Sequence, residues 1–218
     1  MRLTYFGHSA FLVEAADGTR VIIDPYLAGS FDGALRYGAI DEPADVALAT
    51  HEHDDHAATS TIPGNPLTFV HPTKEQVRGV SITGVKVAHD EAGGSKRGKN
   101  TIIVLDDGQV RLAHLGDLGH TLDPATVKAI GRVDVLLVPV GGFFTIDHKE
   151  AAQVVDSLDP RIVVPMHFKT EKTDFPISTV DPFLATQKNI VRQPNSMLEV
   201  TPGSLPAERT VVLLKHSK

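Results

Sequence analysis

Short apolar segments separated by turn residues recur along the whole chain. They are rich in Val, Ile and Leu, which is typical of buried strands. The intervening Asp17-Gly18 and Asp106-Asp107-Gly108-Gln109 favour tight hairpins. We predict about a dozen strands, at Leu3–Phe6, Phe11–Ala15, Val21–Ile23, Val46–Ala49, Leu67–Val70, Val85–Ala88, Thr101–Leu105, Val110–Leu115, Val133–Val138, Ile162–Val164, Leu198–Val200 and Val211–Leu214.

Helical signals fall between these strands. Pro124–Ile130 follows Asp123, an N-cap residue, and begins with proline. Ala151–Leu158 follows Asp147 and Glu150, which have the spacing of a capping box. Two further helices are predicted at Thr73–Arg78 and Val180–Lys188. Strands with interspersed helices predict an α/β sandwich in which helices cover two packed sheets.

Composition narrows the class of protein. Of 218 residues, 41% are hydrophobic and 22% are charged, as in soluble globular proteins. No linker or repeat divides the chain, so we expect a single domain over residues 1–218. The net charge of −6 does not favour a nucleic-acid partner. No signal peptide or membrane-spanning run is visible, so a cytoplasmic protein is expected, with its oligomeric state left open.

The chain has 11 histidines and no cysteine. Disulfides and thiolate metal sites are therefore excluded, and any metal must have nitrogen and oxygen ligands. The segment 50–56, Thr-His-Glu-His-Asp-Asp-His, directly follows a predicted strand. In an extended backbone His51, His53 and Asp55 would point the same way, and a turn would bring His56 to join them. Such a set suits zinc, manganese or ferrous iron, and the alternative is a solvated polar loop.

Further ligand-type residues stand at other strand ends. His89 follows Val85–Ala88, Asp117 follows Val110–Leu115, and His167 follows Ile162–Val164. Strand ends that face one edge of a sandwich converge in space. With the histidine-rich segment they provide seven nitrogen and oxygen ligands, which are too many for one zinc ion and enough for two.

These motifs resemble those of the metallo-β-lactamase fold superfamily over nearly the whole chain. The resemblance rests on HxHxDH at 51–56, Gly116-Asp117, Pro165-x-His167 and Ile23-Asp24-Pro25. More narrowly, the chain resembles small metal-dependent hydrolases near the ascorbate-phosphate lactonases and the N-acyl-phosphatidylethanolamine phospholipases D. That likeness is carried by Phe6-Gly7-His8-Ser9, His114-Leu115-Gly116-Asp117 and Val140-Gly141-Gly142-Phe143.

The resemblance implies a four-layered αββα sandwich with a binuclear metal centre. The implied ligands are His51, His53 and His89 for the first metal, Asp55, His56 and His167 for the second, and Asp117 as a bridge between both. His114 is the alternative to His89 as the third ligand of the first metal. We favour His89 because the family has a histidine before a glycine-rich turn, which would leave His114 to support the ligands or contact substrate.

Zinc is the first candidate for the two divalent ions, and manganese and iron are the next candidates. The two ions would share a bridging water with a pKa of ~7. The resulting hydroxide would attack an ester, lactone or phosphodiester bond, with Asp55 and Asp117 orienting it and accepting its proton. A small-molecule substrate is therefore expected. An iron-dependent redox protein of the same fold and a non-catalytic metal-binding protein remain alternatives.

Several residues are candidates for supporting roles. Lys96 and Arg97, in the loop after His89, could hold an anionic group of the substrate, or form an ordinary basic surface loop. His8 and His148 could line the pocket, or serve structural and surface roles. Asp24 is expected to hydrogen-bond a metal ligand, with simple turn chemistry as the alternative. The segment Gly141–Phe144 could form a substrate wall, but a turn is favoured.

Overall fold

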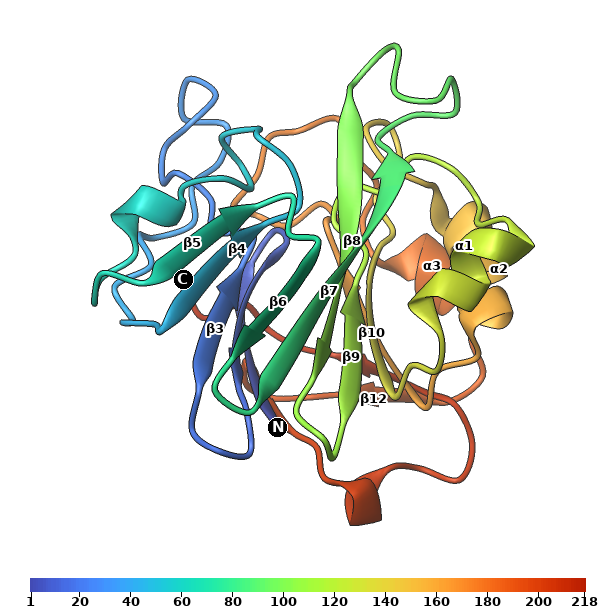
Figure 1. Ribbon diagram of the computed structural model, residues 1–218. Helices are drawn as coiled ribbons and strands as arrows, with labels where there is room; N and C mark the ends of the chain where they lie inside the picture. Colours follow the sequence, from blue (N-terminus) through green and yellow to red (C-terminus); the bar gives the residue numbers. More distant parts are fainter.

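A computed structural model describes all residues from 1 to 218. It consists of two stacked β-sheets with helices on one side (Figure 1). The six-stranded sheet has the order β13-β1-β2-β3-β4-β5. Its strands are β1 (Arg2–Gly7), β2 (Ala10–Glu14), β3 (Arg20–Ile23), β4 (Val46–Ala49), β5 (Leu67–Val70) and β13 (Met197–Glu199).

The second sheet has eight strands in the order β12-β14-β11-β10-β9-β8-β7-β6. These are β6 (Lys74–Val77), β7 (Val80–Ala88), β8 (Lys99–Asp106), β9 (Arg111–His114), β10 (Val135–Pro139), β11 (Ile162–Met166), β12 (Ile190–Arg192) and β14 (Thr210–Leu213). Strands β9, β10 and β11 run parallel, and in the other sheet β4 runs parallel to β3 and β5. Parallel strands end at the same edge, so the residues that follow β9 and β11 emerge at the same edge of the sheet, on either side of β10.

Apolar residues of both sheets form the central core. A cluster of 24 buried residues includes Phe11 and Leu48 of one sheet and Ile103 and Leu137 of the other. A second cluster of 22 lies between the eight-stranded sheet and its helices. These helices are α1 (Pro124–Ile130), α2 (His148–Leu158) and α3 (Asp181–Leu184), which Figure 1 shows together on the outer face of that sheet.

The outer face of the six-stranded sheet is covered differently. Loop residues Tyr26, Leu35 and Tyr37 pack there against Phe6 and Ile22. Besides the sheets and the three α-helices, the chain has two single turns of 3-10 helix, η1 (Thr59–Thr61) and η2 (Pro202–Ser204). The α/β class and the two packed sheets are confirmed, and the layer on this side is formed largely by loops. No helix is both long and apolar enough to cross a membrane.

The predicted helices had different outcomes. Those at 124–130 and 151–158 are confirmed as α1 and α2, and the capping box of Asp147 and Glu150 is present. The predicted helix Thr73–Arg78 is wrong, because Lys74–Val77 pairs antiparallel with β7. Lys, Glu and Gln favour helix locally, but strand pairing and the packing of Val77 against the core outweigh that preference. The helix predicted at 180–188 is limited to α3, and β12 was missed.

Candidate metal centre

Four separate segments deliver ligand-type side chains to one edge of the two sheets. The segment 51–56 follows β4, His89 follows β7, Asp117 lies three residues after β9, and His167 directly follows β11. All of the predicted ligands are buried except His53. The strand ends therefore converge as expected, although the residues are far apart in the sequence.

The backbone from His51 to His56 bends and turns. It is therefore not extended, as the predicted alternation of side chains requires. The backbone N–H groups of His56 and Ala57 both donate to the carbonyl oxygen of His53, at 2.9 Å. This turn separates the motif into two sets. His51 and His53 lie together with His89, whereas Asp55 and His56 lie with His167. The prediction that Asp55 points the same way as His51 and His53 is therefore corrected.

The first set, here the open group, consists of His51, His53 and His89. Nε2 of His51 lies 3.0 Å from Nδ1 of His53, and Nδ1 of His51 lies 3.0 Å from the hydroxyl of Thr50. Burial lowers the pKa of His51 to about 3 and also lowers the pKa of His53. Both imidazoles are neutral at pH 7, which is the form that binds metal ions.

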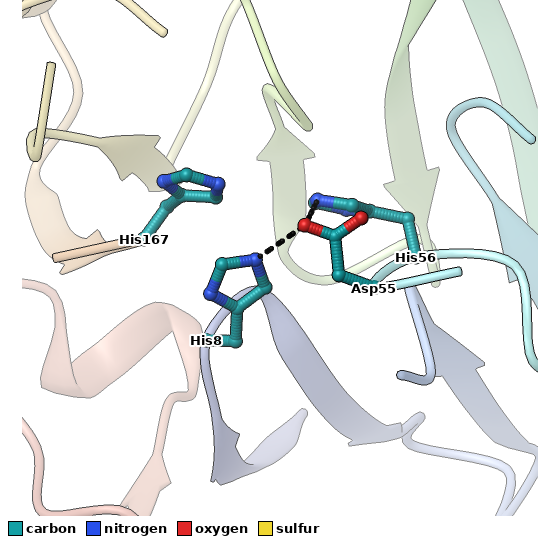
Figure 2. A group of neighbouring side chains, drawn as sticks. All are labelled: His8, Asp55, His56 and His167. Atoms are coloured by element: carbon teal, nitrogen blue, oxygen red, sulfur yellow. Dashed lines mark hydrogen bonds and ion pairs between the residues drawn. The ribbon is translucent and has the colours of Figure 1, made fainter. Parts of the chain in front are cut away.

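The second set, here the closed group, consists of Asp55, His56 and His167 together with His8. Figure 2 shows these four side chains around a common space. Nε2 of His8 lies 3.1 Å from Oδ2 of Asp55, and that oxygen lies 3.6 Å from Nε2 of His56. Burial and the neighbouring His167 lower the pKa of His8 to about 4. Neutral His8 then donates from Nε2 to the carboxylate of Asp55 and orients it.

Asp117 joins the two groups. Its Oδ1 lies 3.1 Å from Nε2 of His56, and its Oδ2 lies 3.2 Å from Nε2 of His89 and 3.4 Å from Nε2 of His167. Burial acts to raise the pKa of Asp117, but His167 and His56 lower it well below its usual range. The side chain is therefore an anion in contact with both groups.

The backbone around Asp117 is fixed by close packing. Oδ1 of Asn100 accepts from the backbone N–H of Asp117 at 3.2 Å, and Nδ2 of Asn100 donates to the carbonyl of Leu115. Gly116 has a φ of +54°, and a Cβ there would lie 2.4 Å from Oδ1 of Asn100 and 2.6 Å from Oγ1 of Thr50. Only glycine fits this position, so Gly116 allows Asp117 to approach the histidines.

Asp24 supports the closed group from behind. Its Oδ2 accepts from Nδ1 of His56 at 2.7 Å, and its Oδ1 accepts from the backbone N–H of Thr50 at 2.8 Å. Burial acts to lower the pKa of His56, but Asp117, Asp55 and Asp24 raise it well above its usual value. So much negative charge around one imidazole favours a cation at its Nε2.

Unpaired polar atoms concentrate at this site. Twelve buried side-chain polar atoms of the chain have no hydrogen-bond partner, and six of them belong to the two groups and Asp117. They are Nδ1 of His8, Nε2 of His56, Nδ1 of His89, Oδ1 of Asp117, and Nδ1 and Nε2 of His167. The 3.1 Å contact between Nε2 of His56 and Oδ1 of Asp117 lacks the geometry of a hydrogen bond. Buried polar atoms without partners are costly, so this nitrogen and oxygen set fits divalent cations.

His114 lies outside both groups. Its Nε2 donates to the carbonyl of Ser9 at 2.8 Å, and its Nδ1 accepts from the backbone N–H of Gly116 at 3.0 Å. Both ring nitrogens are therefore engaged with the backbone, whereas His89 contacts Asp117 directly. His148 is the first residue of α2 and does not line the cavity over the groups.

His53 and His89 of the open group and Asp117 face a cavity of about 570 Å³. It is lined by Phe31, Glu52, His53, Asp54, Asp55, His89, Lys96, Arg97, Asp117, Phe144 and Phe175. Both basic residues singled out from the sequence, Lys96 and Arg97, are therefore at the cavity. Phe144 lies in the turn between β10 and α2, as favoured for Gly141–Phe144, and its side chain also lines the cavity.

The loop that carries the basic residues is held by one carboxylate. Oδ1 of Asp90 accepts from the backbone N–H groups of Ala92 and Gly94, and its Oδ2 accepts from those of Lys96 and Arg97, at 2.7–2.9 Å. Burial acts to raise the pKa of Asp90, but these four hydrogen bonds lower it below its usual range. Lys96 is paired with Glu91, whereas Arg97 has no ion-pair partner and remains available to a ligand.

Sequence reasoning missed Asp90, Phe31 and Phe175. The run Asp90-Glu91-Ala92-Gly93-Gly94 was a possible signal for Asp90, because Asp before glycines often accepts from the following backbone. No spacing pattern links Phe31 and Phe175, which come from separate loops and meet only in the folded chain.

Comparison with known proteins agrees with this architecture. The family model described as the beta-lactamase superfamily domain matches residues 2–167. A UPF0173 protein of Pyrococcus furiosus is 35% identical over 187 residues, covering 78% of this chain and 84% of the relative. A UPF0173 metal-dependent hydrolase of Aeropyrum pernix is 31% identical over 215 residues, covering 83% of this chain and 86% of the relative.

One solved structure is similar over almost its full length. It comes from Thermotoga maritima and is described as a candidate Zn-dependent hydrolase of the metallo-β-lactamase superfamily. The identity is 36% and the TM-score is 0.81, with 98% of this chain and 97% of the other covered.

Proposed function

This chain belongs to the beta-lactamase superfamily, among the UPF0173 metal-dependent hydrolases, and on that premise we propose that it is a hydrolase with a binuclear metal centre. The metals are two divalent cations, with zinc as the first candidate. The substrate is a small anionic molecule with an ester, lactone or phosphodiester bond. The observation that carries the proposal is the contact of Asp117 with His89 of the open group and with His56 and His167 of the closed group.

Each group would hold one ion. His51, His53 and His89 would hold the first, Asp55, His56 and His167 the second, and Asp117 would lie between them. When bound, a pair of divalent cations lowers the pKa of a water molecule toward ~7 and polarises the oxygen of the bond to be cleaved. Zinc suits the set because its ligands are imidazoles and carboxylates without thiolates.

The side chains of this chain then position and transfer protons. The carboxylates of Asp55 and Asp117 face the cavity, where they orient the attacking water and accept its proton. His8 holds Asp55 through a 3.1 Å hydrogen bond, and Asp24 holds His56 through a 2.7 Å hydrogen bond. These partners fix the orientation of the ligands.

The remaining candidates divide between binding and support. Arg97 has no carboxylate partner in the chain, so it is the residue best suited to hold an anionic group of the substrate. His114 acts through the backbone, since its ring nitrogens bond Ser9 and Gly116 and not the cavity.

The proposal is tested by assaying the protein after removal and return of metal. The protein is stripped with a chelator, dialysed, and reconstituted with zinc, manganese or ferrous iron. Hydrolysis is then measured on bis(p-nitrophenyl) phosphate, p-nitrophenyl acetate and δ-valerolactone. We expect activity on at least one substrate that disappears on stripping and returns with zinc or manganese.

Two results would overturn the proposal. Full metal occupancy without turnover of any bond class would favour a metal-binding protein that is not an enzyme. Oxygen-dependent turnover confined to the iron form would favour a redox protein of the same fold. The His216→Ala variant is the control for substitutions of the ligand histidines. His216 bonds Glu171 and the carbonyl of Lys218, away from the cavity.

A further inference from the structure

Three phenylalanine side chains form one wall of the cavity above the metal-type ligands. Phe31, Phe144 and Phe175 come from three different loops. The ring of Phe175 lies 5.2 Å from that of Phe31 at 86° and 5.8 Å from that of Phe144 at 73°. Edge-to-face contacts of this kind order the rings relative to one another, so the wall has a defined shape.

This wall adjoins the closed group directly. The ring of Phe175 also lies 5.7 Å from the imidazole of His8, which bonds Asp55. Phe175 is buried, Phe144 is half-buried, and Phe31 is 46% exposed. The apolar surface thus runs from the ligands outward and is most open at Phe31.

The position of Phe31 is unusual. It has a φ of +55°, and the next residue, Asp32, has a φ of +54°. A bulky residue seldom adopts this left-handed conformation, and strained positions of this kind cluster at ligand-binding sites. An exposed aromatic ring held in this way indicates a surface that a ligand covers.

The cationic side chain of Arg97 lies at the edge of the same wall. The guanidinium carbon of Arg97 lies 5.7 Å from the centre of the Phe144 ring. The backbone of Arg97 is fixed by the carboxylate of Asp90, and its side chain has no ion-pair partner. Aromatic and cationic groups therefore face the cavity together, next to Asp117 and His89.

From this arrangement we infer that the cavity has a subsite for an aromatic or similarly flat apolar group of an anionic substrate. The ring packs against Phe31 and Phe144, and the negative charge lies between Arg97 and the metal centre. This inference rests on the proposed function and narrows its substrate to aryl-substituted anions. Phe31 and Phe144 select the apolar group, whereas Arg97 contributes to the binding of any anion.

The test is a pair of ligands that differ only in the apolar group. Phenylphosphonate and methylphosphonate are titrated into the zinc-reconstituted protein by isothermal calorimetry. We expect phenylphosphonate to bind at least about 10-fold more tightly, because the ring buries apolar surface that a methyl group cannot. Phe31→Ala and Phe144→Ala should each reduce that ratio severalfold. Arg97→Ala should weaken both ligands about equally and leave the ratio unchanged.

The matched control for Phe31→Ala is Leu27→Ala. Leu27 is in the same loop and is 45% exposed, but it does not line the cavity. Its replacement should leave the ratio of affinities unchanged. Metal content is measured for each variant, so that loss of zinc is not mistaken for loss of the subsite.

Equal affinity for the two phosphonates, or a ratio that persists in both phenylalanine variants, would overturn the inference. Either result is compatible with hydrolysis of simple esters or diesters, so the proposed function could survive it. Conversely, a phenyl preference that depends on Phe31 and Phe144 would support the subsite even if no bond in the assay panel were hydrolysed. The two proposals can therefore fail separately.

Discussion

The open group and the closed group use similar ligands in contrasting surroundings. The open group has three imidazoles, of which His53 is exposed and His53 and His89 line the cavity. The closed group has a carboxylate among its ligands, and its His56 is fully buried and bonded to Asp24. Only Asp55 of the closed group lines the cavity.

This difference separates two tasks. The closed group lies in the protein interior, where a buried charge that loses its partner is destabilising. We therefore expect its residues to affect stability as well as metal binding. The open group is less enclosed, because His53 and His89 line the cavity, where a ligand can approach. Asp117 contacts both and makes them one centre.

The largest effect is expected where the two groups meet. Asp117→Ala removes an anion within 3.4 Å of three histidines. Metal affinity should fall by at least roughly 100-fold in each group, because loss of a shared ligand should exceed the loss seen for residues that only support ligands. Competition with a chromogenic chelator measures both affinities, and circular dichroism checks the fold. If one group kept its wild-type affinity, the two groups would be independent sites.

A smaller effect is expected on the free energy of unfolding, and it should differ between the two groups. In metal-free protein, His56→Ala leaves the buried Asp24 without its imidazole partner, so the free energy of unfolding should fall by about 3–5 kcal/mol. His53→Ala changes an exposed side chain and should cost about 0.5 kcal/mol. Urea denaturation measures both values. Similar losses for the two variants would contradict the distinction between a closed and an open group.

The pH dependence of the metal-free protein is expected to be more modest. Burial lowers the pKa of His51 to about 3 and, with His167, that of His8 to about 4, both from 6.5. Below pH 6.5 the unfolded chain binds protons that these folded residues do not, so stability should decline as the pH falls from 7 to 4. His56, with a raised pKa, has the opposite sign, and its contribution is lost as the pH rises through its folded value.

Urea denaturation at several pH values tests this balance. The decline between pH 6.5 and 4 should be smaller in the His51→Asn variant, because asparagine does not titrate. A stability that is constant or increases toward pH 4 would show that His51 and His8 are not held neutral by burial.

The smallest effect is expected at the rim of the cavity. Arg97→Ala removes the cation that has no partner in the chain, and the KM of an anionic substrate should rise roughly 5-fold, or ~1 kcal/mol. The metal content should stay unchanged. Steady-state kinetics on the substrate found in the assay panel, with Lys96→Ala for comparison, measures the change. Lys96 is paired with Glu91, so an equal or larger effect at Lys96 would contradict the role of Arg97.

The sequence predicts the parts of the site that follow local rules. HxHxDH, His89, Asp117 and His167 each follow a strand that an apolar run predicts, and strand ends converge at an edge. The division of the motif into two groups could not be predicted in this way. It depends on the turn in which the N–H groups of His56 and Ala57 bond the carbonyl of His53.

Other features depend on contacts between distant segments. The strand Lys74–Val77 looks helical by composition and is a strand because β7 pairs with it. Phe31 and Phe175 meet across two loops, and His8 reaches Asp55 from a turn 47 residues earlier. No periodic pattern in the sequence marks such contacts, so they are found only in the folded chain.

The measurement that tests the central claim most directly is anomalous X-ray diffraction from crystals of the protein saturated with zinc. The account predicts two zinc ions per chain, one bound by His51, His53 and His89 and the other by Asp55, His56 and His167, with Asp117 between them. Zinc–nitrogen distances of ~2.0–2.1 Å would be expected. A single ion, or zinc bound only away from these residues, would contradict the binuclear centre.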